Sequence, residues 1–248
     1  MDVGFRGMME GARSRLIIAL DVTERPLLER ALKLIDETYE YAAAFKVNRH
    51  LTIPLSLNEL SRLTSAIHDA GLPAIADCKV NDVSGTNRVM AELLIEAGFD
   101  ALTVSPVIGW EGGLEPVYEL ARGAGVGVLE LVYMSHPGAR RYYEALVVDV
   151  ETATMRRLYE LLAADALRRG ADGLIVAATR PDVVSRVKAM SRGRAPIYSP
   201  GIGPQGGVVE EAVRAGADFI IVGRSVVLSE RPREEASKLY RLVQAIVG

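Results

Sequence analysis

The fold of this 248-residue chain is indicated by a seven-residue stretch, Gly98-Phe99-Asp100-Ala101-Leu102-Thr103-Val104. Residues 170–176 and 216–222 repeat its pattern, in which a glycine and an aspartate precede a run of apolar residues. A glycine at this place can end a helix in the left-handed conformation, so that a strand begins directly afterwards. The repeat therefore predicts tight turns from helix to strand, which would form the structural end of a barrel.

Eight short apolar runs alternate with longer amphipathic segments along the chain. The runs cover residues 16–20, 42–47, 74–76, 101–104, 126–131, 173–176, 195–198 and 219–222. Alternating strands and helices over about 250 residues predict a single-domain (β/α)8 TIM barrel. A doubly wound open sheet is the competing fold, but residues 21–24 after the first run lack its glycine-rich fingerprint.

The composition is that of an ordinary enzyme of one domain. The chain is 49% hydrophobic and 25% charged, and its net charge of -3 gives no electrostatic reason to expect a nucleic-acid partner. Cys78 is the single cysteine, which excludes an internal disulfide and fits a reducing compartment. Because neither a signal peptide nor a run of membrane-spanning length is recognised, we expect a cytoplasmic location and no membrane partner.

The first residues of the chain match no pattern. We expect residues 1–14 to form an N-terminal extension, a candidate for disorder, and residues 15–248 to form the catalytic TIM-barrel domain.

Three charged residues, Asp77, Lys79 and Asp82, follow the third apolar run. Because a strand has a period of two, Asp77 and Lys79 should point to the same face as Ile75. Charges on the inward face of a buried strand are unfavourable unless they are paired, and chains tolerate them chiefly at functional sites. A lysine between two aspartates stays protonated and is held in place, as a positioned proton donor must be. Lys79 is therefore the candidate catalytic acid.

Two further ionisable residues lie in neighbouring runs. Asp21 closes the first run, although an aspartate there is also a common helix N-cap. Lys46 lies near the end of the second run, where a lysine must either pair its charge or extend it to solvent. With Asp77 and Lys79, these residues supply two acids and two bases from three successive strand ends. Their charges nearly cancel, as a mutually paired buried network requires.

Glycine-rich sequences follow the last two runs. Residues 199–207, Ser-Pro-Gly-Ile-Gly-Pro-Gln-Gly-Gly, come after the seventh run and contain Pro200. Gly223 and Arg224 come directly after the eighth run. In barrels, the loops after these two strands often bind a phosphate through backbone N–H groups, and an arginine adds a fixed positive fork. This end of the barrel is the predicted phosphate site.

Three polar residues carry a weaker signal. Ser135 follows the fifth run within Met-Ser-His-Pro-Gly, which could equally be an ordinary turn. Gln205 could reach a ligand from its loop or simply be exposed. Thr86 is expected in the first turn of the helix after the third run, where it would face solvent or cap the helix.

These residues together resemble the orotidine 5′-phosphate decarboxylase family in its short archaeal form. The core of the resemblance is the Asp-x-Lys-x-x-Asp motif of Asp77, Lys79 and Asp82. It is joined, in the family's order, by Leu-Asp at 20–21, Phe-Lys-Val at 45–47, Met-Ser-His-Pro-Gly at 134–138, the glycine-rich loop at 199–207 and Val-Gly-Arg-Ser at 222–225. Each motif alone is weak, whereas the ordered set, which spans nearly the whole chain, is highly specific.

The resemblance implies conversion of orotidine monophosphate to uridine monophosphate and carbon dioxide, in pyrimidine biosynthesis. Asp77 would lie against the substrate carboxylate, and Lys79 would protonate the ring carbon once carbon dioxide leaves. Lys46 and Asp21 would hold the ribose hydroxyls and complete the charged network. This reaction would need no cofactor and no metal, because a fixed ammonium stabilises the developing negative charge more than the ground state.

The remaining site residues receive roles in the same way. The resemblance implies that Ser135 reads the pyrimidine edge and that Gln205 bridges base and phosphate from a closing loop. Arg224 and the backbone of Gly223 would hold the phosphate, next to Pro200.

Asp82 and Thr86 would act in a second subunit. In the family that the chain resembles, these positions reach into the active site of the partner, which implies a homodimer. The family commonly has isoleucine after the last aspartate of the motif, where this chain has Val83, a conservative change.

Other functions stay open from the sequence. Magnesium-dependent sugar-phosphate decarboxylases and synthases of the same superfamily share Asp-x-Lys-x-x-Asp, but they place a carboxylate ligand where this chain has Lys46. A non-catalytic nucleotide-binding barrel would keep the phosphate loops, yet it would have no need of Lys79 between two acids. A purely structural network is disfavoured, because an apolar replacement would usually be as stable.

Overall fold

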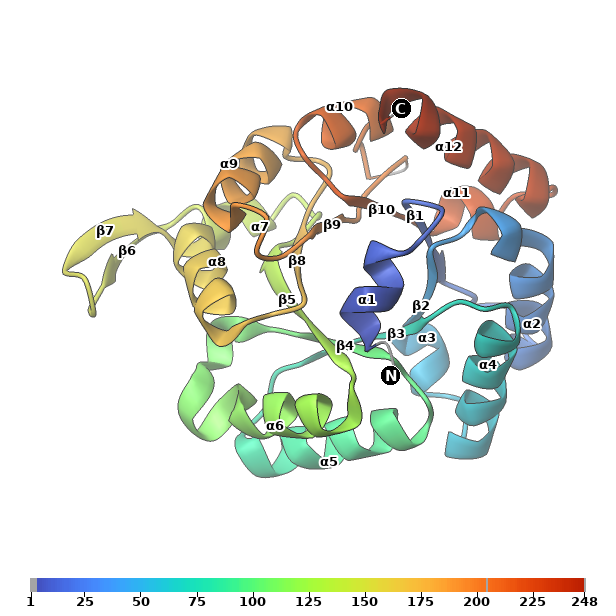
Figure 1. Cartoon of the computed structure of the whole chain (residues 1–248), viewed down its shortest axis with the longest axis horizontal. Coiled ribbons are helices and arrows are strands. Elements are labelled where there is room, and N and C mark those ends of the chain that lie inside the picture. The colour runs from blue at the N-terminus through green and yellow to red at the C-terminus, as the bar shows by residue number, and fades with distance from the viewer. Residues whose placement is uncertain (1–3, 204, 248) are drawn as a thin grey trace.

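Eight parallel strands close into a barrel in the order β1-β10-β9-β8-β5-β4-β3-β2 (Figure 1). The computed structural model describes residues 4–203 and 205–247. The barrel strands are β1 (Leu16–Leu20), β2 (Ala44–Asn48), β3 (Ala74–Val80), β4 (Ala101–Val104), β5 (Gly127–Tyr133), β8 (Gly173–Val176), β9 (Ile197–Ser199) and β10 (Phe219–Val222). Each predicted apolar run overlaps one of these strands, and the predicted TIM barrel is confirmed.

Helices cover the outside of the barrel as a ring (Figure 1). The longer ones are α2 (Leu27–Thr38), α4 (Leu57–Asp69), α5 (Ser84–Glu96), α6 (Glu115–Ala124), α8 (Leu158–Arg169), α9 (Pro181–Ser191) and α12 (Pro232–Val247). The shorter ones are α1 (Phe5–Glu10), α3 (Arg49–Thr52), α7 (Ala139–Tyr143), α10 (Val209–Arg214) and α11 (Arg224–Val227). Because the helices and the barrel interior bury both faces of the strands, the strands are mostly apolar on both faces rather than alternating.

Alternate residues of each strand belong to two different cores. Ile17 of β1 and Ile75 of β3 point into the barrel and pack with other buried interior side chains. Leu16 and Ile18 of β1 point outward and pack beneath the helices. This alternation decides which side chains at the strand ends can reach a site at the barrel mouth.

The predicted helix-to-strand turns are present at the end of the barrel where the strands begin. Gly98, Gly170 and Gly216 have φ values of 87°, 77° and 106°, which favour glycine. The aspartate two residues after each glycine accepts a hydrogen bond from a backbone N–H of the neighbouring strand. These bonds join Asp100 to Ala74 (2.7 Å), Asp172 to Val128 (2.8 Å) and Asp218 to Ile197 (2.8 Å). The repeat therefore fastens strands to one another.

Helix α1 lies across the end of the barrel where the strands begin, opposite the end where they finish (Figure 1). Phe5 and Met9, one helical turn apart, are 1% and 3% exposed and pack with the barrel interior. Gly127 of β5 makes room for this contact, since a Cβ atom there would overlap the Phe5 ring. Residues 5–10, inside the expected extension, thus form a helix whose two buried apolar side chains face the core together. Residues 1–3 lie outside the described residues.

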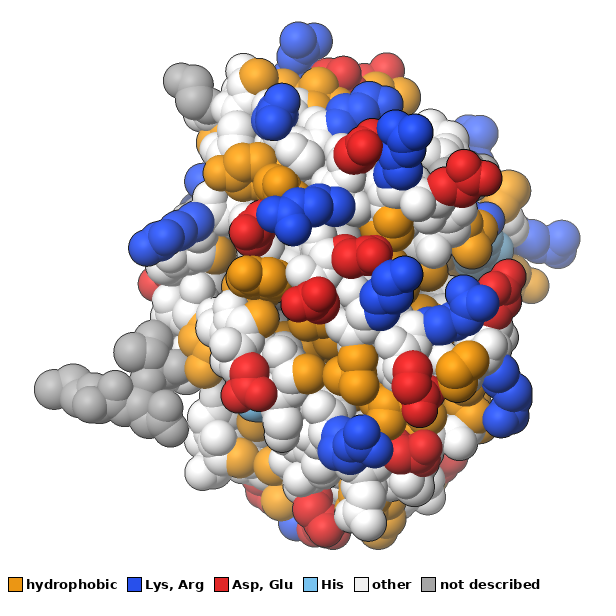
Figure 2. Space-filling view, turned by 90° about the vertical axis from the view of Figure 1, so that its right-hand side faces the viewer, with side chains coloured by type: hydrophobic (Ala, Val, Ile, Leu, Met, Phe, Trp, Pro, Cys, Tyr) orange, Lys and Arg blue, Asp and Glu red, His pale blue; other side chains and the backbone are white. Residues whose placement is uncertain are grey.

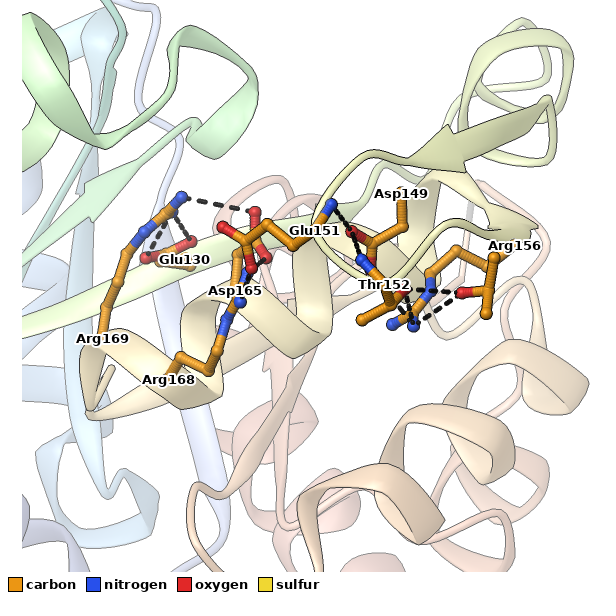
Figure 3. A network of polar contacts seen from close by, with 9 residues as sticks. Glu130, Asp149, Glu151, Thr152, Arg156, Asp165, Arg168 and Arg169 are labelled. Atoms are coloured by element: carbon orange, nitrogen blue, oxygen red, sulfur yellow. Dashed lines mark hydrogen bonds and ion pairs between the residues drawn. The ribbon is translucent and has the colours of Figure 1, made fainter.

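An antiparallel hairpin that the sequence did not predict projects from the side of the barrel between α7 and α8 (Figure 1). Its strands are β6 (Leu146–Asp149) and β7 (Thr154–Arg157). A hairpin of this size is marginally stable alone and needs other contacts. Within it, Arg156 pairs with Asp149 at 3.1 Å (Figure 3).

A chain of ion pairs joins this hairpin to the barrel (Figure 3). Arg168 of α8 pairs with Glu151 in the hairpin turn and with Asp165. Arg169 bridges Asp165 at 3.5 Å and Glu130 of β5 at 3.2 Å. Burial raises the pKa of Glu130, although Arg169 opposes the rise. The hairpin is therefore anchored through α8 to a carboxylate beneath the helical ring.

The face over α2 and α4 carries acidic and basic side chains in a mixture, with apolar side chains scattered among them (Figure 2). Lys33 and Glu37, one turn apart on α2, form one such pair at 3.6 Å. Within residues 4–203 and 205–247, none of the helices is both long enough and apolar enough to cross a membrane.

Candidate active site

A cavity of about 250 Å³ opens where the barrel strands end. It is lined by every site residue that the sequence predicted except Asp82 and Thr86. The predicted residues that line it are Asp21, Lys46, Asp77, Lys79, Ser135, Pro200, Gln205, Gly223 and Arg224. They come from β1, β2, β3, β5, β9 and β10 or from the loops that follow these strands, so the barrel brings together residues that are distant in sequence.

The Asp77 carboxylate is the centre of the charged network. Its Oδ2 atom lies 2.5 Å from Nζ of Lys46, and its Oδ1 atom lies 2.7 Å from Nζ of Lys79. The Thr103 hydroxyl also donates to Oδ1, at 3.1 Å. Lys46 and Asp77 are buried, whereas the Lys79 side chain keeps 28% of its surface exposed and can face a ligand in the cavity.

Burial and charge act in opposite directions on these groups. Burial alone would raise the pKa of Asp77, but the Lys46 and Lys79 ammonium groups outweigh it and hold that pKa well below its usual range. Burial alone would lower the pKa of Lys46, but the Asp77 and Asp21 carboxylates outweigh it and raise that pKa. The network therefore keeps one anion between two cations at neutral pH.

The backbone of Lys79 has an unusual conformation. Its φ angle is 48°, in the left-handed region that side chains other than glycine rarely adopt. The apolar run ends at Ala76, and β3 continues to Val80, so Asp77 and Lys79 belong to the strand, as predicted. Residues held in sparsely populated backbone conformations are concentrated at functional sites.

Asn48 is a polar site residue that the sequence reasoning missed. Its side-chain amide donates to Oδ1 of Asp21 at 3.1 Å, and it lines the cavity. It follows Lys46 by two positions in β2, so the period of the strand could have indicated that both face the same way.

Apolar residues form another part of the lining that was not predicted. Leu131, Ile175 and Ile221 belong to the barrel interior and also line the cavity, together with Met134 and Ile202. The sequence does not distinguish these residues from the rest of the core, because they line the cavity only through their position near the carboxyl ends of the strands. Their apolar side chains make this part of the cavity wall unfavourable for water.

The glycine-rich loop and the turn after β10 form the opposite wall. Gly201 has a φ of 98°, and its carbonyl accepts a hydrogen bond from the N–H of Gly207 at 3.0 Å, which closes the loop on itself. Gly223 lies against Asp21, and a Cβ atom there would come within 2.5 Å of the Asp21 Oδ2 atom. Arg224 follows as the first residue of α11. Glycine is thus required where the backbone approaches the acid.

Asp82 and Thr86 do not reach the cavity of their own chain. Both are exposed, before α5 and in its first turn. The backbone N–H of Asp82 donates to the side chain of Asn87 at 2.9 Å, which fixes the turn after β3.

A metal site would require several ligating side chains close together. Within the described ranges 4–203 and 205–247, no group of three His, Cys, Asp or Glu side chains is placed so that it could hold a metal ion.

Comparison with known sequences identifies relatives along nearly the whole chain. The sequence model of the orotidine 5′-phosphate decarboxylase / HUMPS family matches residues 14–239. An orotidine 5′-phosphate decarboxylase of Thermococcus kodakarensis is 39% identical over 234 residues, which cover 94% of this chain and 99% of the relative. One from Methanosarcina mazei is 36% identical over 230 residues, with 93% and 95% covered.

Comparison with solved structures agrees. An orotidine 5′-monophosphate decarboxylase of Methanocaldococcus jannaschii, complexed with the inhibitor BMP, superposes with a TM-score of 0.79 at 26% identity and covers 93% of this chain and 98% of its own. The UMP synthase of Leishmania donovani superposes with a TM-score of 0.87 at 29% identity, covering 98% of this chain and 56% of that longer protein.

Proposed function

The chain belongs to the orotidine 5′-phosphate decarboxylase / HUMPS family, and from that membership we propose that it converts orotidine 5′-phosphate into uridine 5′-phosphate and carbon dioxide. The activity is that of a carboxy-lyase. The observation that carries the proposal is the Asp77 carboxylate held between Lys46 and Lys79, in a cavity whose opposite wall is a glycine-rich loop and Arg224.

We propose the following reaction. The bond between the ring carbon and the substrate carboxylate breaks, carbon dioxide leaves, and the electron pair stays on the ring carbon. Lys79 transfers a proton from Nζ to that carbon, which gives the product and a neutral amine. Solvent then returns a proton to Lys79 after product release. No electrons are gained or lost, so no oxidant or reductant is needed.

Asp77 and Lys79 act at different stages of this reaction. The Asp77 carboxylate would face the substrate carboxylate, and repulsion between the two would be relieved as carbon dioxide leaves. The Lys79 ammonium faces the charge that develops on the ring carbon and stabilises it more than it stabilises the ground state. Apolar lining such as Leu131 and Ile175 strengthens this interaction, because charges attract more strongly where water is excluded.

The other lining residues fit the remaining parts of the substrate. We assign the ribose hydroxyls to Lys46 and Asp21, and the pyrimidine edge to Ser135. Gln205 would bridge base and phosphate from its loop, and Pro200 lines the same cavity. Arg224 and the N–H of Gly223 would hold the phosphate by charge-assisted hydrogen bonds.

A magnesium-dependent sugar-phosphate reaction fits the same cavity poorly. Both oxygens of Asp77 are already bound to lysine ammonium groups, at 2.5 and 2.7 Å. A divalent cation there would compete with two positive charges for one carboxylate, and hard cations require several oxygen ligands.

We propose that the enzyme is a homodimer in which Asp82 and Thr86 complete the cavity of the partner. Both are exposed in the single chain. Val83, Val89 and Leu93, next to them and along α5, are 66%, 53% and 46% exposed. Apolar side chains gathered around polar site residues are typical of a protein–protein interface. A cytoplasmic location agrees with the free, buried thiol of Cys78.

The test of the proposed reaction is direct. Purified enzyme with orotidine 5′-phosphate and a chelator should consume the orotate chromophore, followed by ultraviolet absorbance, and release one uridine 5′-phosphate per substrate. The Lys79→Ala variant should bind uridine 5′-phosphate with similar affinity but give no turnover. Absence of turnover by the wild-type enzyme, or strict dependence on magnesium, would refute the assignment.

A further inference from the structure

We propose that Thr103 is a positioning residue that sets the place of the Lys79 ammonium, an inference that rests on the proposed function of Lys79 as proton donor. Thr103 lies in β4 next to β3, is 1% exposed and does not line the cavity. Its hydroxyl contacts both Asp77 and Lys79 of the neighbouring strand.

The pairing of β3 with β4 is interrupted at the catalytic residues. Ala76 pairs with Leu102, and the next register pair joins Val80 to Val104. Three residues of β3, from Asp77 to Lys79, therefore face the single residue Thr103. Such bulges bend a strand and redirect a side chain, and they leave backbone groups without a ladder partner.

The Thr103 hydroxyl supplies the missing partner. It accepts a hydrogen bond from the backbone N–H of Lys79 at 2.9 Å and donates one to Oδ1 of Asp77 at 3.1 Å. The same Oδ1 atom receives the Lys79 ammonium at 2.7 Å. One hydroxyl thus fixes both ends of the Lys79 residue relative to the carboxylate, its backbone directly and its Nζ atom through Asp77.

A second side chain holds the bulge from the other side. The Nε atom of Arg49, the first residue of α3, donates to the carbonyl of Cys78 at 3.0 Å, and its Nη2 atom lies 3.4 Å from the carbonyl of Lys79. Arg49 begins where β2 ends, so its guanidinium takes the place of strand pairing on that side. The left-handed conformation of Lys79 is therefore held between a hydroxyl and a guanidinium.

The consequence for the reaction is geometric. A proton donor must lie in line with the carbon that it protonates, and a displacement near 1 Å can lower a rate by about 100-fold. Without the hydroxyl, the N–H of Lys79 loses its partner and Asp77 loses one donor, so the flexible side chain of Lys79 can sample other positions. Phosphate binding on the opposite wall does not depend on this contact.

The test compares Thr103→Val, which keeps the shape and removes the hydroxyl, with Thr103→Ser, which keeps the hydroxyl. We expect Thr103→Val to lower kcat by about 10- to 100-fold with less than about a threefold change in KM, and Thr103→Ser to stay within about threefold of wild type. Thr38→Val is the matched control, because Thr38 is also buried and its hydroxyl only donates to the carbonyl of Leu34, in α2.

A second readout does not depend on turnover. The chain has five lysines, so the Cε methylene signals of isotope-labelled lysine should resolve, and Lys79→Ala identifies the signal of Lys79. We expect the order parameter of the Lys79 methylene to fall in Thr103→Val and to be kept in Thr103→Ser. If Thr103→Val did not fold, Thr103→Ala with the same measurements would take its place.

The outcomes separate the two proposals. Turnover by the wild type with full kcat in Thr103→Val overturns the positioning role and leaves the decarboxylase assignment intact. An unchanged order parameter in a folded Thr103→Val overturns it as well. Lack of turnover in the wild type refutes the decarboxylase, while the order parameter still decides whether Thr103 fixes Lys79.

Discussion

The Nζ atom of Lys46 lies 2.5 Å from Oδ2 of Asp77, and both residues are less than 8% exposed. This pair joins two adjacent barrel strands at the floor of the cavity. Neither charge has enough contact with water to be stable without the other. The stability of the barrel mouth is consequently linked to the chemistry that takes place there.

The pair predicts a pH dependence of stability. The pKa of Asp77 is below its ordinary value of 3.8, so its stabilising contribution is complete above about pH 4 and is lost as the pH falls towards the folded-state pKa. The pKa of Lys46 is above 10.5, so its contribution is present below that pH and is lost as the pH rises through the folded-state pKa. The contribution of this pair to the free energy of unfolding should therefore be constant between these limits.

Asp77→Asn tests this dependence. It should lower the free energy of unfolding by about 3–5 kcal/mol at pH 7, because it leaves a buried lysine without its nearest anion. The difference from wild type, measured by urea unfolding at several pH values, should persist to about pH 5 and shrink below pH 4. Asp69→Asn, at an exposed position, should change the free energy of unfolding by less than about 0.5 kcal/mol. A difference that grew towards acid pH would contradict the sign of the Asp77 shift.

Mixed dimers test the partner role of Asp82. A Lys79→Ala subunit and an Asp82→Asn subunit should each be inactive alone. In the hybrid, one site combines an intact Lys79 with the intact Asp82 of the partner. Random exchange should therefore restore about a quarter of wild-type activity, since half of the dimers are hybrid and one of their two sites is complete. Activity that never recovers on mixing, with hybrid dimers verified by mass, would place Asp82 in its own chain's site.

Arg224→Ala should separate phosphate binding from chemistry. Loss of charge-assisted hydrogen bonds of about 1.5–3 kcal/mol should lower kcat/KM for orotidine 5′-phosphate by about 10- to 150-fold. The nucleoside without its phosphate should react equally slowly with both enzymes. Arg62→Ala, on the exposed surface of α4, should behave as wild type. An equal loss with the nucleoside would mean that Arg224 acts on the reacting part of the substrate.

Neighbouring methionines test the role of helix α1. Met9 is 3% exposed against the barrel interior, whereas Met8 is 37% exposed. Met9→Ala should lower the free energy of unfolding by about 2–5 kcal/mol, and Met8→Ala by about 0.5 kcal/mol or less. Thermal and urea unfolding measure both, and KM should stay unchanged in each. Similar small losses would mean that α1 contributes little to the closure of the barrel.

The barrel and most of the cavity lining could be predicted from the sequence because each depends on local signals. Strand period placed Asp77 and Lys79 on one face, and the glycine-rich loop placed the phosphate end. Lys46 was recognisable because a lysine in so apolar a strand requires a partner. These residues all line one cavity at the carboxyl ends of the strands, as the order of the motifs implied.

Other features depend on packing between distant segments. Thr103 belongs to the repeat at 98–104, and nothing in the sequence distinguishes it from an ordinary core residue. The burial of α1 requires Gly127, far along the chain, to leave space for Phe5. The β6–β7 hairpin is stabilised by ion pairs that no periodicity encodes.

The three aspartates that follow Gly98, Gly170 and Gly216 have a consequence for how this protein can be altered. They hold strands together at one end of the barrel, while the cavity with Lys46, Asp77 and Lys79 lies at the other. Loops at the catalytic end can therefore be exchanged between relatives, as modules, without loss of the fastening. The same separation lets evolution, or a protein engineer, retain this scaffold while changing its substrate.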